Sequence, residues 1–269
     1  MMDTPNDLSS VKGNTDSKTD HYRSLAKSYD FITKERSEAK FASLLKYLDI
    51  QPDHIVVDIG SGTGCLAEKV FEKFQLKNPI WCVEPCAEMQ EVAKKRRGVL
   101  PIQKTAGEFF KDSVDSDQRF DRVMCIAAAH HFGDPVKIYK SIKSCLSPGG
   151  VLVMELLKPE ANNTYPFFTK AEKGLDTILV GAKENICTCL RLANFDVEVL
   201  EERMDFGVTK SKWYDMLRGR FYSSLRELND VEIEEGIDEL ERGKLKDLKL
   251  QDHIVISNTF NIFIAKKEH

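Results

Sequence analysis

The sequence has 269 residues, of which 42% are hydrophobic and 30% are charged, and its 39 basic and 43 acidic side chains give a net charge of −4. A chain of this length forms one large domain, or one domain with a modest insertion, and buries a substantial core. The slight negative charge disfavours a surface built mainly to bind nucleic acid, and no apolar run reaches the roughly 18–20 residues that a membrane span requires.

The first 20 residues are expected to form a disordered tail, because their few apolar side chains cannot bury enough surface to order the segment. They also lack the apolar stretch of a secretory signal peptide. The seven cysteines therefore indicate reduced thiols in the cytoplasm rather than disulfides. Their spacing matches no zinc-finger arrangement, so no metal site is expected.

The middle of the chain alternates between helical and strand-like patterns. Apolar residues recur three and four positions apart from Asp20 to Asp49, which predicts a helix. Short apolar runs between turn-forming residues predict buried strands at 55–59, 80–84, 98–104, 121–126 and 151–156. Helical patterns stand between these strands at 65–74, 87–97 and 135–145. This alternation indicates βαβ units and a parallel sheet in an α/β fold.

The pattern changes after Leu157. A loop is expected at 158–170, followed by a helix at 183–193 and a strand at 195–200. An aromatic amphipathic helix is then expected at 210–225, a charged helix at 231–250 and a final strand at 254–266. We therefore expect a single domain over residues 21–269, with a helical cap insertion at about 205–252.

The strongest chemical signal is the glycine-rich segment VVDIGSGTG at residues 56–64, where a strand meets a helix. Glycine permits positive φ and lets a ligand approach the backbone, and the helix N-terminus offers free N–H groups to an anion. A tight strand–helix turn with no ligand is the structural alternative. The spacing G-x-G-x-G departs by one residue from the dinucleotide fingerprint G-x-G-x-x-G, which argues against a nicotinamide-dependent oxidoreductase.

An acidic residue, Glu84, ends the next predicted strand. A carboxylate at this position can accept hydrogen bonds from both ribose hydroxyls of a nucleoside ligand. Pro85 follows it, and Met89 lies one turn into the next helix, where its thioether packs either on an adenine ring or in the core.

Four segments in order carry a resemblance to a known family: VVDIGSGTG, WCVEPCAEMQEVAKK, FDRVMCIAAAHHF and LSPGGVLVMEL. The chain resembles the class I S-adenosylmethionine-dependent methyltransferases over residues 50–156. The resemblance implies a Rossmann-like fold, in which a seven-stranded, mostly parallel sheet has helices on both faces and a reversed last strand. It also implies S-adenosylmethionine as the cofactor.

The resemblance further implies which residues bind this cofactor. Asp58 and the loop at 60–64 would hold the methionine moiety, Glu84 the ribose and residues 106–108 the adenine, while Ala127 and His130 would lie beneath the cofactor. The expected cofactor-binding residues are Asp58, Gly60, Ser61, Gly62, Gly64, Glu84, Pro85, Met89, Ala106, Gly107, Glu108 and Ala127.

The catalytic end of such a sheet lies at the carboxyl ends of its strands. His130 and His131 follow the fourth strand and are candidate general bases, because the imidazole pKa lies near neutrality. Residues of the first helix, the strand ends and the cap are expected to bind the substrate, with core packing as the alternative for Trp213. These residues are Tyr22, Tyr29, Glu155, Tyr165, Trp213 and Tyr214.

These features predict a cytoplasmic methyltransferase that acts by in-line displacement on a nitrogen or oxygen atom of a small-molecule metabolite. The expected partner is this acceptor, without nucleic acid or membrane, and the oligomeric state stays open with a monomer as the default. Two alternatives are kept: a non-catalytic methyltransferase-like binding subunit and a protein or RNA methyltransferase. The lack of a long basic run argues against the second.

Overall fold

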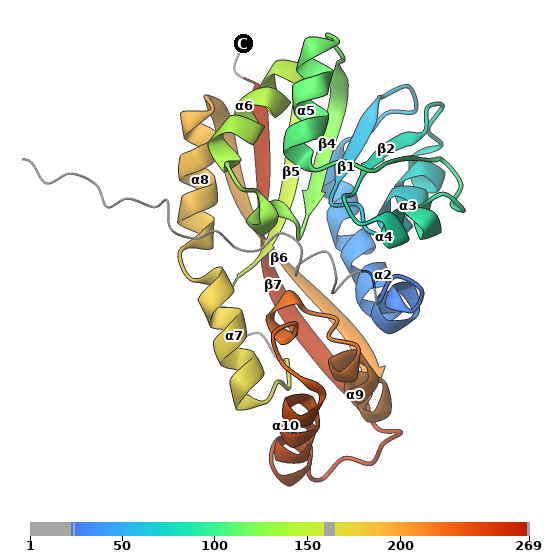
Figure 1. Ribbon diagram of the computed structural model, residues 1–269, viewed down its shortest axis with the longest axis vertical. Helices are drawn as coiled ribbons and strands as arrows, with labels where there is room; N and C mark the ends of the chain where they lie inside the picture. Colours follow the sequence, from blue (N-terminus) through green and yellow to red (C-terminus); the bar gives the residue numbers. More distant parts are fainter. Residues whose placement is uncertain (1–22, 24, 159–164, 268–269) are drawn as a thin grey trace, which may run out of the picture.

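The computed structural model describes residues 23, 25–158 and 165–267, so the predicted tail at 1–20 and Tyr22 lie outside the described residues. Helix α2 (Tyr29–Leu48) precedes the sheet, and strands then alternate with helices as the sequence predicts, with one further helix, α5 (Ala106–Asp115), that was not predicted (Figure 1). The strands are β1 (Val56–Ile59), β2 (Ile80–Val83), β3 (Val99–Ile102), β4 (Phe120–Ile126) and β5 (Leu146–Leu157). The helices between them are α3 (Cys65–Phe74), α4 (Ala87–Ala93), α5 (Ala106–Asp115) and α6 (Pro135–Cys145).

The last part of the chain differs from prediction in its boundaries. Its elements are α7 (Thr169–Leu179), α8 (Ala182–Leu192), β6 (Phe195–Thr209), α9 (Lys210–Arg218), α10 (Asp230–Arg242) and β7 (His253–Lys267). Helix α7 was not predicted, and the helices expected at 210–225 and 231–250 end earlier, next to Gly219 and Gly243. Strand β6 continues well beyond its predicted end because it pairs with β7 along its whole length.

The predicted seven-stranded sheet with a reversed last strand is confirmed. The strand order is β3-β2-β1-β4-β5-β7-β6, and β7 runs antiparallel to both of its neighbours. The order reverses between β1 and β4, and right-handed crossovers then place the helices before and after this point on opposite faces. Accordingly, α5, α6 and α8 pack side by side, whereas α2 packs against α3 (Figure 1).

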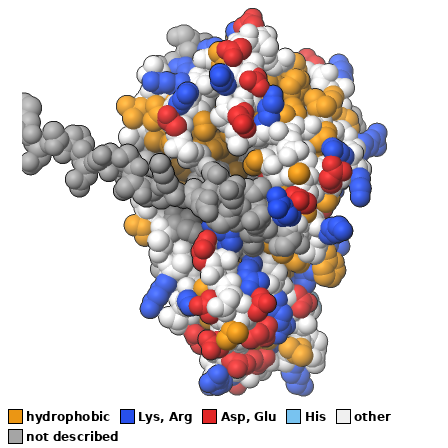
Figure 2. All heavy atoms as spheres, in the orientation of Figure 1, with side chains coloured by type: hydrophobic (Ala, Val, Ile, Leu, Met, Phe, Trp, Pro, Cys, Tyr) orange, Lys and Arg blue, Asp and Glu red, His pale blue; other side chains and the backbone are white. Residues whose placement is uncertain are grey.

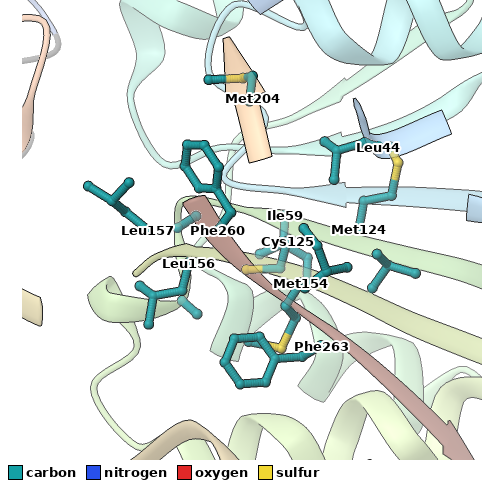
Figure 3. Packing of buried hydrophobic residues seen from close by; sticks show 14 of the residues in the cluster. Leu44, Ile59, Met124, Cys125, Met154, Leu156, Leu157, Met204, Phe260 and Phe263 are labelled. Carbon is teal, nitrogen blue, oxygen red and sulfur yellow. The ribbon is translucent and has the colours of Figure 1, made fainter. Parts of the chain in front are cut away.

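The core follows from the two-residue repeat of the strands. Phe260 and Phe263 lie three positions apart on β7 and point to opposite sides of the sheet, Phe260 toward Leu157 and Phe263 toward Met154 (Figure 3). Leu44 of α2 covers the sheet and is fully buried. All seven cysteines are free thiols. Within the described ranges, no helix is both long and apolar enough to cross a membrane.

The β6–β7 hairpin extends beyond β5 and carries a cap at its far end, formed by α9, α10 and the chain around them (Figure 1). A buried lysine, Lys210, holds this cap together. Its Nζ donates hydrogen bonds to the carbonyl oxygens of Leu245 at 2.9 Å and Leu248 at 2.8 Å and forms an ion pair with Glu241 at 2.7 Å. Figure 2 shows acidic side chains gathered over this end of the molecule.

The packing of β7 predicts a strong dependence of stability on its buried positions. Ile262→Ala should lower the free energy of unfolding by about 2–5 kcal/mol, because the 1% exposed side chain leaves a cavity in the core. Val255→Ala on the same strand should cost less than about 1 kcal/mol, because Val255 is 67% exposed. Urea unfolding of both variants measures the difference, and equal losses would contradict this packing.

Candidate functional site

A large cavity lies at the carboxyl ends of β1, β2 and β4, where the strand order reverses. Its volume is about 340 Å³. Ligands of open α/β sheets bind at this kind of crevice. Eleven of the residues singled out from the sequence line it: Tyr29, Asp58, Gly60, Ser61, Gly62, Glu84, Pro85, Met89, Ala106, Ala127 and His131.

The turn after β1 requires glycine for two separate reasons. At Gly60 φ is +67°, and a Cβ atom there would lie 2.4 Å from the Cβ of Ala128. At Gly62 φ is +54° and a Cβ atom would meet no described atom within 4 Å, so the backbone there is open to the cavity. Ala127 at the end of β4 also has a positive φ, 56°, which is rare for a residue with a side chain and is common at functional sites.

A buried carboxylate, Asp58, and a half-buried one, Glu84, face the larger cavity. Burial raises the pKa of Asp58 to about 7, and the negative charge of Glu84 acts in the same direction. Burial also raises the pKa of Glu84, while hydrogen bonds from the backbone N–H groups of Cys86 and Gly62, at 2.9 and 3.1 Å, oppose that shift. The cavity therefore presents acceptor groups and negative charge to a ligand.

Helix α2 is fastened to the glycine turn by a small polar network. The hydroxyl of Thr63 donates to Asp30 Oδ1 at 2.5 Å, and Arg96 forms an ion pair with the same aspartate. Arg96 also donates from Nε to the carbonyl oxygen of Thr63 at 2.6 Å. The first turn of α2 is thereby held over the larger cavity, which Tyr29 and Asp30 help to line.

A second, smaller cavity of about 80 Å³ adjoins the first. Tyr29, Arg36 and Ala127 line both cavities. The predicted residues His130 and Glu155 line the smaller one. The rest of its wall comes from β5, α7, the cap and β7: Leu156, Leu157, Leu175, Leu179, Phe221, Tyr222 and Phe260.

A buried cluster of charges and phenols lies at the junction of the two cavities. Lys40 Nζ forms an ion pair with Glu155 at 2.9 Å. Arg36 Nη2 donates to the hydroxyl of Tyr222 at 3.4 Å, and this hydroxyl lies 2.6 Å from that of Tyr165. Burial lowers the pKa of Lys40 to about 8, the charge of Arg36 adds to this effect, and Glu155 opposes it.

Several predicted residues lie elsewhere. Gly64, Gly107 and Glu108 are outside both linings, and Glu108 accepts hydrogen bonds from Thr105 in a capping box at the start of α5. Trp213 and Tyr214 are buried in the cap region and line neither cavity, and the Trp213 indole donates to the carbonyl oxygen of Pro166 at 3.1 Å.

Arg36 and Lys40 were not predicted as site residues, although the sequence of α2 contains a pattern that indicates them. The buried face of α2 includes Ile32, Arg36, Lys40, Leu44 and Leu48, which are spaced four residues apart. Two cations on an otherwise apolar stripe depart from the usual pattern of a core-facing helix. Such a departure predicts a buried polar site.

The comparison with protein families identifies one domain. Residues 57–154 match the family described as a methyltransferase domain. This range begins in β1, ends in β5 and includes most of the lining of the larger cavity.

Individual relatives are distant. The chain is 26% identical over 142 residues to a ubiquinone biosynthesis O-methyltransferase of Histophilus somni, and 24% identical over 136 residues to a tRNA U34 carboxymethyltransferase of Idiomarina loihiensis. The matches cover 50% and 49% of this chain but 58% and 42% of those proteins, so the chain spans about half the length of the curated relatives it matches.

A solved structure supports the fold. A putative methyltransferase from an antibiotic biosynthesis pathway of Anabaena variabilis superimposes with a TM-score of 0.60 at 19% identity. The superposition covers 83% of this chain and 95% of that one.

The raised pKa of Asp58 predicts how stability changes with pH. The folded-state pKa of about 7 lies above the ordinary value of 3.8, so the unfolded chain releases this proton at lower pH. The charged carboxylate therefore destabilises the fold increasingly as the pH rises from about 4 to 7, by up to roughly 4 kcal/mol. Asp58→Asn should remove this dependence.

Urea unfolding at about pH 4.5, 6 and 8 tests this expectation. The stability of Asp58→Asn relative to the unmodified protein should increase across the series. Asp247→Asn, which changes an exposed carboxylate in the same way, serves as the control. A stability difference for Asp58→Asn that is independent of pH would contradict the raised pKa.

Proposed function

We propose that this chain, which belongs to the class I S-adenosylmethionine-dependent methyltransferase superfamily, transfers a methyl group to a nitrogen or oxygen atom of a small molecule. The observation that carries the proposal is the shared wall of the two cavities, formed by Tyr29, Arg36 and Ala127. An acceptor in the smaller cavity would lie directly beside a methyl donor in the larger one.

S-adenosylmethionine is the cofactor of this superfamily, and the larger cavity has the chemistry to hold it. The cofactor carries positive charge on its methionine portion and hydroxyl groups on its ribose, and the cavity offers the carboxylates of Asp58 and Glu84. We assign Asp58 to the methionine portion and Glu84 to the ribose. The apolar lining at Met89 and Ala106 suits the adenine, and the open backbone at Gly62 permits close approach.

When bound, the cofactor supplies a methyl group activated by a positively charged sulfur. The chain itself must orient the acceptor and exclude water from it. His130 lines the smaller cavity and is the proposed proton acceptor for an acceptor atom that has to lose a proton. His131 lines the larger cavity instead, with its ring centroid 4.0 Å from that of His130.

The size and lining of the smaller cavity favour a small acceptor. Its volume is about 80 Å³, and its wall is mostly leucine and aromatic side chains. A nucleotide within a folded RNA would instead need an open approach with basic side chains along the phosphates. The tRNA enzymes among the relatives make RNA the competing acceptor. We place the enzyme in the cytoplasm, where the free cysteine thiols stay reduced.

The assigned role of Glu84 predicts a loss of cofactor affinity on its removal. Glu84→Ala should weaken S-adenosylmethionine binding by more than about 1 kcal/mol, or about fivefold in Kd, because charge-assisted hydrogen bonds are lost. Isothermal titration calorimetry measures the change. Glu91→Ala on α4 removes an exposed carboxylate and should bind the cofactor normally. If Glu84→Ala binds as tightly as Glu91→Ala, the ribose assignment is wrong.

A labelled-methyl experiment tests the acceptor class. The protein is incubated with methyl-labelled S-adenosylmethionine and a cell extract, which is then separated into low-mass, RNA and protein fractions. We expect the label in the low-mass fraction, and a roughly 100-fold lower rate for His130→Ala if the histidine accepts a proton. Heat-denatured protein provides the blank. Label confined to RNA or protein would overturn the small-molecule proposal.

A further inference from the structure

The smaller cavity contains a cation whose charge no described carboxylate balances. Arg36 is 9% exposed and lines both cavities. Its Nε is buried without a hydrogen-bond partner among the described residues, and its guanidinium carbon lies 5.0 Å from the ring centroid of Tyr222. A buried charged group with an unsatisfied donor is costly unless a ligand completes its environment.

The neighbouring carboxylate is already paired. Glu155 forms its ion pair with Lys40, so two cations share one anion at this junction. The other titratable groups of the smaller cavity are Tyr29, Tyr222 and His130. Burial raises the pKa of the Tyr29 phenol, which keeps it uncharged near neutral pH. The junction therefore carries a net positive charge of about one, opposite in sign to the carboxylates Asp30, Asp58 and Glu84 of the larger cavity.

The geometry points to a methyl acceptor that carries a carboxylate, held by the guanidinium of Arg36, with a small aliphatic or aromatic part against Leu175, Leu179 and Phe221. A guanidinium matches the planar shape of a carboxylate. A single negative charge balances the junction, whereas a doubly charged phosphate would need further donors in a wall that is mostly apolar. This inference rests on the proposed function, because it names the acceptor class of the same site.

Three probes that share one isobutyl group test the charge preference: 3-methylbutanoate, its isosteric amide 3-methylbutanamide, and the slightly smaller cation 3-methylbutylamine. Each is titrated into protein saturated with S-adenosylhomocysteine, and its Kd is measured by ligand-observed NMR. We expect the acid to bind at least about tenfold more tightly than the amide or the amine. In Arg36→Gln this preference should fall below about threefold.

Two further variants complete the design. Arg119→Gln removes the same charge just before β4, at the amino end of that strand and so away from the site, and should keep the full preference for the acid. Arg36→Lys keeps the charge but not the planar fork, and should retain part of the preference. If Arg36→Gln does not fold, Arg36→Lys serves as the test variant in its place.

The outcomes separate this inference from the function on which it rests. Preferential binding of the amine, or equal binding of acid and amide, overturns the carboxylate assignment. The carboxylate assignment is also overturned if none of the probes binds to protein that does bind S-adenosylhomocysteine. In all three cases the methyltransferase proposal is unaffected. Failure of the folded protein to bind S-adenosylmethionine or S-adenosylhomocysteine would overturn both.

Discussion

The position of the site depends on how closely the turn after β1 approaches the end of β4. The 2.4 Å separation between a Cβ atom on Gly60 and that of Ala128 leaves no room for any side chain at residue 60. β1 and β4 are neighbours at the point where the strand order reverses, so this contact determines the width of the crevice there. Ala127, which precedes the contact, lines both cavities, so the contact lies next to the wall that the two cavities share.

Helix α2 links the two halves of the site. Its first turn is attached to the glycine turn through Asp30 and Thr63, and its next turns bring Arg36 and Lys40 to the junction of the cavities. Arg36 lines both cavities and Lys40 lines the larger one, beside the carboxylates Asp58 and Glu84. Under the proposed function, helix α2 would therefore contribute to the recognition of both the methyl donor and the acceptor.

The sequence predicted the cofactor half of the fold well because buried parallel strands are short apolar runs bounded by turns. It predicted the acceptor half less well, for three physical reasons. Helix α7 contains Gly174, where a Cβ atom would lie 3.1 Å from the carbonyl oxygen of Ser224, and a glycine within polar residues resembles a loop. Arg36 and Lys40 occupy apolar positions of a helix, which periodicity alone treats as exceptions. The ring centroid of Trp213 lies 6.0 Å from that of Tyr165 and 5.3 Å from that of Phe221. An aromatic stripe on a helix has the same sequence pattern whether it packs in the core or lines a binding site, so the sequence could not distinguish the two.

The cap leaves and re-enters the sheet at paired positions, Thr209 and His253. A segment with adjacent ends can be exchanged for another without altering the register of the strands that carry it. Within the described chain, the larger cavity draws its lining from residues 29–132, while Phe221 and Tyr222 of the cap line only the smaller one. The architecture is therefore modular: replacing residues 210–252 would remodel the cap side of the smaller cavity and would act on the larger cavity through contacts with α2, such as that of Tyr222 with Arg36.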